Sequence, residues 1–204
     1  VNIGNTFDYP SMHGNALARM GVSYVSSSIN AIESLQPYTL VDIIMGKQKG
    51  EKTDTIGCIP PHLRNAIQAY TNQGGKILLT GSYIASDMRH TCDTAFTHNM
   101  LHYRYKTEKA STCGRINFQY DILPTKQYEY YTKPNPQVIE CEWPDGIEPM
   151  TGGVRIARYD DTYVNAGVAY QDAKNRMIIL PFMLESIKDF DALYSDCINW
   201  LLHP

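Results

Sequence analysis

The residues best suited to chemistry lie in Gly81–Ala85, GSYIA, between an apolar strand and a predicted helix. A strand–turn–helix with the pattern Gly-x-nucleophile-x-Gly strains its central residue and directs that side chain into a crevice. The central residue here is Tyr83, which could transfer a proton if a cation or metal lowered its pKa from about 10. We favour packing, or stacking against a sugar, as the role of its ring.

Ser82 is the alternative nucleophile at this turn. A serine hydroxyl needs a base such as His13 or His90 within about 3 Å, and sequence spacing does not establish such a contact. Hydroxyl groups at tight turns more often bond to nearby backbone groups. We therefore favour a structural role for Ser82.

Acidic residues and one histidine complete the candidate site. Asp87 is expected in the first turn of the following helix, where a carboxylate offsets the helix dipole. Asp8, His13 and Glu185 could meet at the same rim if residues 1–5 end a neighbouring strand. Their unrelated spacings are a poor signal for a metal, so we expect no metal and no cofactor. The candidate binding residues are Asp8, His13, Ser82, Tyr83, Asp87 and Glu185.

Buried strands and amphipathic helices must position these residues. Lys76–Thr80, Leu40–Met45 and Arg176–Leu180 are too apolar to be half exposed, which predicts a parallel sheet covered on both faces. In such sheets, ligands bind at the carboxyl ends of the strands. Pro60–Pro61 begins a helix that Gly74–Gly75 ends. The final helix follows Asp189, with an apolar face formed by Phe190, Leu193, Tyr194, Cys197, Ile198 and Leu201.

The N-terminal third contains weaker signals. Ser11 is predicted to cap a helix that runs to about Met20. Ser23–Ser26 is predicted as a short strand, and Ser28 as the cap of a short helix through Leu35. Gly46–Ile59 is polar and is predicted to be a mobile loop.

The middle of the chain is rich in tyrosine, threonine, valine and isoleucine, which is typical of antiparallel strands. The predicted strands are Tyr103–Thr107, Gly114–Tyr120, Tyr128–Thr132, Val138–Glu142, Val154–Tyr159 and Tyr163–Tyr170. The fold hypothesis is an α/β, flavodoxin-like three-layer sandwich. Its single domain spans residues 1–204 and carries a β-rich insertion or extension at about 103–170.

Composition excludes some partners. The 204 residues carry a net charge of −3 and no stripe of lysine or arginine, so we expect no nucleic-acid partner. No apolar run is long enough to span a membrane. The five cysteines contain no Cys-x-x-Cys pair, although Cys92 and Cys113 could form one disulfide.

Two segments resemble the class I glutamine amidotransferase-like fold. GGKILLTGSYIASD resembles its nucleophile elbow, and RMIILPFMLESI resembles the place where that fold carries its histidine and glutamate. Tyr83 stands where the resemblance implies cysteine, and Ala85 stands at the second glycine. The closing segment contains Glu185 but no histidine. Because amidotransferase catalysis needs an activated thiolate, we expect no glutamine hydrolysis by that mechanism.

Together with NTFDYPSMHG and VDIIMGKQK, these segments resemble a domain of secreted Bacteroides-type proteins labelled xanthan lyase-like or golvesin-associated. The resemblance implies a secreted, periplasmic or cell-surface protein and a module of a longer polypeptide, contacting flanking domains. It predicts a non-catalytic module that binds a polysaccharide or acts as an interdomain scaffold. The alternative is a polysaccharide lyase or hydrolase acting at the Ser82–Tyr83 crevice.

Overall fold

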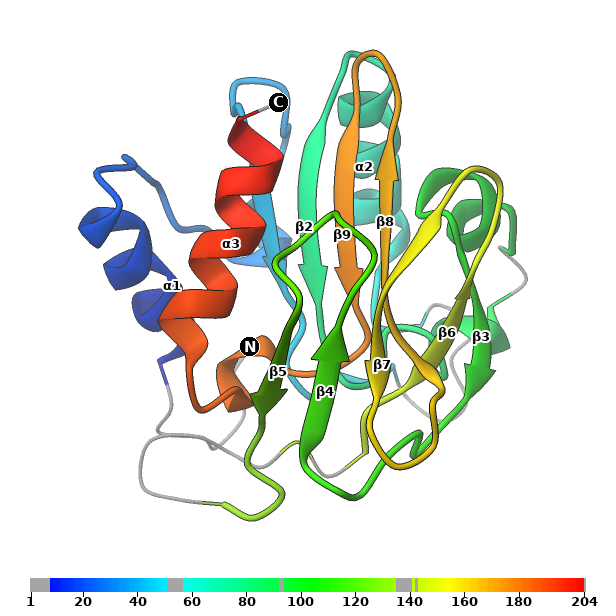
Figure 1. The fold of residues 1–204 in the computed structure, drawn as a ribbon. Coiled ribbons are helices and arrows are strands. Elements are labelled where there is room, and N and C mark those ends of the chain that lie inside the picture. The colour runs from blue at the N-terminus through cyan, green and yellow to red at the C-terminus, as the bar shows by residue number, and fades with distance from the viewer. Residues whose placement is uncertain (1–7, 51–56, 92–93, 135–140, 142, 204) are drawn as a thin grey trace.

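The computed structural model describes residues 8–50, 57–91, 94–134, 141 and 143–203 (Figure 1). The strand proposed at residues 1–5 and the centre of the Gly46–Ile59 loop lie outside this range. The α-helices are α1 (Tyr9–Arg19), α2 (Pro61–Thr71) and α3 (Phe190–Leu202). Shorter helical turns occupy Ile29–Ala31, Met88–His90, Phe96–Met100 and Leu184–Ser186.

Most strands belong to one mixed sheet in the order β1-β2-β9-β8-β7-β4-β5, while β3 and β6 form a separate pair. The strands are β1 (Val41–Ile44), β2 (Lys76–Thr80), β3 (Tyr103–Thr107), β4 (Arg115–Phe118), β5 (Lys126–Glu129), β6 (Gly146–Pro149), β7 (Val154–Tyr159), β8 (Asn165–Gln171) and β9 (Arg176–Leu180). β2 pairs in parallel with β1 and β9, which confirms it as an inner parallel strand. The other pairs are antiparallel.

Strand β2 shows why its sequence is apolar throughout. Successive side chains of a strand point to opposite faces, and both faces of β2 are covered. Leu78 packs in the core beside α3, whereas Ile77 and Leu79 pack in the core beside Ile67 of α2. The helices α1 and α3 cover one face and α2 covers the other (Figure 1). The predicted three-layer α/β fold is thus confirmed.

Helix α3 also follows its sequence pattern. Asp189 is the residue preceding the helix, as predicted, and all six residues of the predicted apolar face are buried. None of the helices in the described part of the chain is long and apolar enough to cross a membrane.

Apart from the separate pair β3 and β6, the antiparallel strands extend the main sheet. β8 pairs with β9 at Val168–Ile179, and β7, β4 and β5 continue outward from it. Strand β6 was not predicted, and β5 begins two residues before the expected Tyr128. The strand proposed at Val138–Glu142 falls mainly on residues that the structure does not describe.

Three local predictions are wrong. Helix α1 begins earlier than expected, because Asp8 caps it by accepting a hydrogen bond from the Ser11 backbone N–H at 3.1 Å. Ser23–Ser26 forms no strand, and its Val25 is 70% exposed. Ser28 precedes only the short turn Ile29–Ala31 and makes no side-chain cap.

Candidate functional site

The turn at Gly81 lies where the sequence placed it, at the carboxyl ends of β1, β2 and β9. Gly81 N–H donates to Leu180 at the end of β9 (3.2 Å), and Ser82 N–H donates to Gly46 after β1 (2.9 Å). The chain then forms consecutive turns through Asp87 and the short helical turn Met88–His90, not the predicted longer helix. We refer to residues 81–87 as the elbow.

Ser82 is fully buried, and among the described residues its hydroxyl has no hydrogen bond to a histidine. Its Oγ lies 3.7 Å from Sγ of Cys141, a thiol that burial keeps protonated by raising its pKa. The side chain of His90 lies outside the described part of the structure. Ser82 therefore shows the geometry of a packed hydroxyl.

Tyr83 is 9% exposed, and the ammonium nitrogen of Lys49 lies over its ring, 3.8 Å from the ring centroid. This distance is typical of a cation–π interaction. Asp87 precedes the short helical turn Met88–His90 and makes no side-chain capping bond, so it does not lie in the first turn of a longer helix as expected. Its carboxylate accepts a hydrogen bond from Gly50 N–H at 2.9 Å, so Asp87 and Tyr83 both hold the loop after β1.

His13 forms a buried charged network on the opposite side of the parallel strands from α2. His13 Nδ1 lies 2.6 Å from Asp42 of β1, and His13 Nε2 lies 3.4 Å from Glu185 after β9. Tyr194 of α3 donates its hydroxyl to the same Asp42 oxygen at 2.8 Å. The rings of Phe190 and Tyr194 flank the imidazole at 5.0 and 4.8 Å. We refer to His13, Asp42, Glu185 and Tyr194 as the His13 network.

The electrostatics of this network fix its protonation state. Burial alone would lower the pKa of His13, but the carboxylates of Asp42 and Glu185 outweigh it and raise that pKa to about 10. The imidazole is therefore protonated at neutral pH. A protonated imidazole has no free lone pair to accept a proton, so His13 cannot act as a general base for Ser82.

Of the three residues proposed to meet at the rim of the elbow, only His13 and Glu185 lie together, and they do so in a buried network. Asp8 remains exposed at the start of α1 and bonds to Ser11. Hydrogen bonds from Ser11 lower the pKa of Asp8. Asp8 is therefore a helix cap and takes no part in the His13 network.

A carboxylate that the sequence did not single out closes the elbow. Asp145 Oδ2 accepts hydrogen bonds from the backbone N–H groups of Ala85 (2.9 Å) and Ser86 (2.6 Å). Asp145 is fully buried, and burial raises its pKa to about 7 although those N–H bonds lower it. Asp145 and Cys141 both lie between β5 and β6 in the sequence, and both contact residues at the carboxyl ends of β2 and β9. Cys141 contacts Ser82, and Asp145 N–H donates to Pro181.

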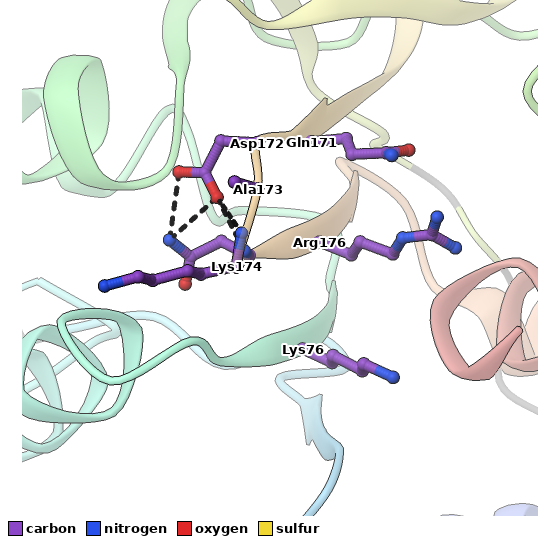
Figure 2. A pocket seen from close by; sticks show the side chains of 7 residues that line it. Lys76, Gln171, Asp172, Ala173, Lys174 and Arg176 are labelled. Atoms are coloured by element: carbon purple, nitrogen blue, oxygen red, sulfur yellow. Dashed lines mark hydrogen bonds between the residues drawn. The ribbon is translucent and has the colours of Figure 1, made fainter. Parts of the chain in front are cut away.

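A hollow of about 320 Å³ lies at the other end of the sheet, around the β8–β9 turn (Figure 2). Asp172 fixes this turn by accepting from the backbone N–H groups of Lys174 (2.7 Å) and Asn175 (2.6 Å), contacts that lower its pKa. Lys76 and Arg176 donate to carbonyls at the end of α3, where cations stabilise a helix. These polar groups therefore hold secondary-structure ends together.

The described residues contain no cluster of three or more His, Cys, Asp or Glu side chains that could hold a metal. The described cysteines, Cys58, Cys113, Cys141 and Cys197, are free thiols. Cys92, the partner proposed for Cys113, lies outside the described residues.

The fold is a mixed sheet with helices on both faces, of the class I glutamine amidotransferase-like kind, and it is similar to part of several solved β-galactosidases. A β-galactosidase from Rahnella sp. R3 superposes on 92% of this chain with a TM-score of 0.60 at 17% sequence identity. The β-galactosidase from Bacillus circulans sp. alkalophilus covers 98% with a TM-score of 0.60 at 13% identity. Gan42B, a GH42 β-galactosidase from G. stearothermophilus, covers 97% with a TM-score of 0.59 at 15% identity.

The matched region is only part of those enzymes. The chain spans 26%, 28% and 26% of their respective lengths. No protein-family model and no curated protein matches the sequence. At these identities the likeness establishes the fold, and the sequence resemblance to xanthan lyase-like proteins stays a prediction.

Proposed function

We propose that this chain is a non-catalytic accessory domain of a multidomain carbohydrate-processing protein, in which it acts as an interdomain scaffold. The region that this fold matches makes up about a quarter of the length of each β-galactosidase described above. This supports a role as one domain among several. An extracellular, periplasmic or cell-surface location is part of the same proposal, and it comes from the sequence resemblance alone.

One observation supports the proposal most directly: side chains of this chain occupy the elbow, where a substrate would have to bind. The turn that would position a nucleophile holds a buried Ser82 against Cys141, while Asp145 occupies the N–H groups of Ala85 and Ser86. A reactive elbow needs a solvent-reachable nucleophile and a free donor pair for the developing anion. The described structure offers neither at this position.

Activity measurements test the non-catalytic part. The purified protein is incubated with a panel of polysaccharides, and unsaturated-uronate absorbance and new reducing ends are followed beside Ser82→Ala and Tyr83→Phe. We expect no turnover by any of the three proteins. Turnover by the wild type that either substitution abolishes would overturn the proposal and establish the lyase or hydrolase alternative.

Cross-linking tests the scaffold part. In the full gene product, we expect lysine-directed cross-linkers to join exposed lysines of this chain to flanking domains reproducibly and without added glycan. A gene product in which this chain forms only internal cross-links would contradict a scaffold role.

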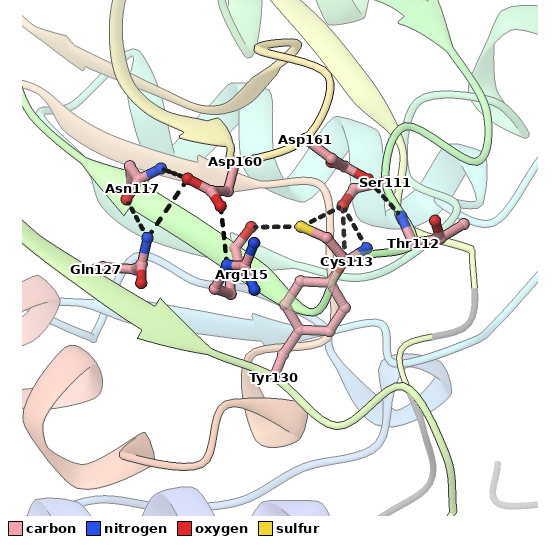
Figure 3. A network of polar contacts seen from close by, with 9 residues as sticks. All are labelled: Ser111, Thr112, Cys113, Arg115, Asn117, Gln127, Tyr130, Asp160 and Asp161. Carbon is pink, nitrogen blue, oxygen red and sulfur yellow. Dashed lines mark hydrogen bonds and ion pairs between the residues drawn. The ribbon is translucent and has the colours of Figure 1, made fainter.

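Glycan binding is a second candidate, and the outward face of β4, β5 and β7 favours it. Asn117, Gln127 and Asp160 form a hydrogen-bonded row across this face (Figure 3). Nearby, Tyr120 is 41% exposed, with the guanidinium of Arg158 at 5.7 Å from its ring. Planar amide and carboxylate groups beside an exposed aromatic ring are suited to hydroxyl bonding and stacking with a sugar.

Affinity electrophoresis in polysaccharide gels tests this second candidate. If the face binds glycans, wild-type mobility is retarded, and Tyr120→Ala and Gln127→Ala both restore free mobility. Tyr163→Ala is the matched control, because Tyr163 is 73% exposed but lies on the β7–β8 turn. If Tyr163→Ala abolished the retardation, or if the wild type were not retarded, this face would not be a glycan-binding site. The scaffold role would then stand alone.

A further inference from the structure

Two backbone N–H groups of the elbow converge on a single oxygen atom. Ala85 and Ser86 both donate to Oδ2 of Asp145, at 2.9 and 2.6 Å. Successive N–H groups that point to one place form a concavity that favours an anion. In this protein the occupant of that concavity comes from a segment 59 and 60 positions further along the chain.

The backbone around Asp145 is held on several sides. Its N–H donates to Pro181 after β9 (2.8 Å), and its carbonyl accepts the hydroxyl of Tyr159 (2.8 Å). The preceding Pro144 accepts from Ala110 N–H at 2.8 Å. These contacts place the carboxyl group in the elbow without help from a side-chain cation.

The second carboxyl oxygen is an independent sign of a ligand-like fit. Asp145 is 0% exposed, and its Oδ1 has no hydrogen-bond partner among the residues that the structure describes. Oδ2 can thus accept both N–H bonds while Oδ1 carries a proton or remains bare. The carboxyl group of Asp145 is held by the backbone N–H groups of Ala85 and Ser86 and by the side chain of Ser86, and no side-chain cation pairs with it in the described part of the chain. A buried carboxyl held by neutral donors resembles a bound small carboxylic acid more closely than it resembles one partner of a salt bridge.

We propose that the elbow is a carboxylate-binding site which the chain occupies with its own Asp145, and that shortening this side chain opens the site to a small free carboxylate such as formate or acetate. The side chain of Asp145 from Cβ outward is itself the shape of acetate. The inference concerns what closes the elbow and does not rest on the scaffold role.

The test is rescue of Asp145→Ala by acetate and formate, followed by thermal unfolding. In Asp145→Ala we expect a saturable rise in Tm of about 2–4 °C once the anion exceeds its Kd about fivefold. Sodium chloride at equal ionic strength should not reproduce it. The wild type, whose site is filled, and Asp191→Ala, which loses an exposed carboxylate paired with Arg19, should show no saturable response.

An NMR experiment and a second variant test whether the anion binds at the elbow itself. In ¹⁵N-labelled Asp145→Ala, the amide resonances of Ala85 and Ser86 should move on adding formate, because those N–H groups receive the anion. Asp145→Asn keeps an oxygen acceptor in place and should not respond to acetate. If Asp145→Ala is unfolded in buffer, formate in preference to chloride should refold it, as measured by circular dichroism.

The proposal would be overturned if acetate raised the Tm of Asp145→Ala and of the wild type equally. It would also be overturned if Asp145→Asn responded as strongly as Asp145→Ala, or if formate did not refold an unfolded Asp145→Ala. None of these results bears on glycan turnover or cross-linking, so this inference and the proposed function fail separately.

Discussion

At the scale of single residues, the dominant feature is one imidazolium buried between two carboxylates. His13 is 2% exposed, Glu185 is 0% exposed, and the side chain of Asp42 is 12% exposed. Removing one partner from such a group leaves buried charge without compensation, which costs far more than the intact group contributes. The network also joins α1, β1, α3 and the segment after β9, so its loss affects both the sheet and its helical cover.

We predict that His13→Ala lowers the free energy of unfolding by about 3–5 kcal/mol, as measured by urea denaturation, because Asp42 and Glu185 lose their cation. Adding Glu185→Gln should recover part of this loss, since one uncompensated charge disappears. Arg19→Ala is the control: its ion pair with Asp191 joins side chains that are 57% and 59% exposed, and such pairs contribute about 0–1 kcal/mol. Similar losses for His13→Ala and Arg19→Ala would contradict the prediction.

The pH dependence of stability follows from the same residue. The pKa of His13 rises from 6.5 to about 10 on folding, so between these values the folded protein binds more protons than the unfolded chain. The contribution of His13 to the free energy of unfolding is therefore present in full below pH 6.5, and it is lost as pH rises through about 10. The difference in unfolding free energy between wild type and His13→Gln should shrink from pH 6 to pH 9.5. A constant difference over this range would show that His13 is not charged in the fold.

The residues of this network were only half predictable. His13 and Glu185 were candidates because titratable side chains flanked predicted strand ends. Asp42 and Tyr194 were missed because one lies within an apolar strand and the other on the apolar face of the last helix, where the sequence pattern predicts core residues. The available signal was the carboxylate of Asp42 inside an otherwise apolar strand, since a buried carboxylate requires a partner. Asp145 gave no comparable signal, because it lies between a proline and a glycine that favour a loop.

At the scale of elements, the elbow depends on close approach between the ends of β1 and β2. A Cβ added at Gly81 would lie 2.6 Å from Met45 Cβ and 3.0 Å from Ile84 Cγ2. We predict that Gly81→Ala destabilises the protein by about 1–3 kcal/mol through overpacking, measured by chemical denaturation. It should also weaken the acetate response of Asp145→Ala, because the turn that carries Ala85 and Ser86 must shift.

Gly21→Ala separates crowding from backbone strain. Gly21 has φ +73° and no atom within 4 Å of an added Cβ, so its substitution tests strain without crowding. We expect Gly21→Ala to destabilise the protein while leaving the acetate response of Asp145→Ala intact. An equal effect of both glycine substitutions on acetate binding would argue against crowding at Gly81 as the cause.

Elements were predictable where burial alone determines them. Lys76–Thr80 and Arg176–Leu180 were located to the residue, since strands covered on both faces must be apolar throughout. Ser23–Ser26 has strand-like residues but no described neighbour to pair with, and local preference alone does not make a strand. Strand β6 contains Gly146 and Pro149, residues that weaken strand signals, and it forms through its pairing with β3.

At the scale of the whole molecule, the sheet has a buried parallel part and an antiparallel part that ends in an edge. Strands β2 and β9 have a neighbour on each side and a helical layer on each face, whereas β5 ends the sheet with mostly exposed side chains. Local opening requires the least energy where few apolar contacts hold a strand. Stability should therefore decrease from β2 and β9 toward β5.

Hydrogen exchange followed by mass spectrometry measures this gradient. Peptides covering β2 and β9 should exchange only through global unfolding, and peptides covering β5 should exchange faster through local opening. Leu193→Ala removes a fully buried side chain of α3 and should cost about 2–5 kcal/mol. It should accelerate exchange in β2 and β9 in proportion to that loss while leaving β5 nearly unchanged, because β5 already opens without global unfolding. If β5 exchanged as slowly as β2 in the wild type, the sheet would unfold as one unit.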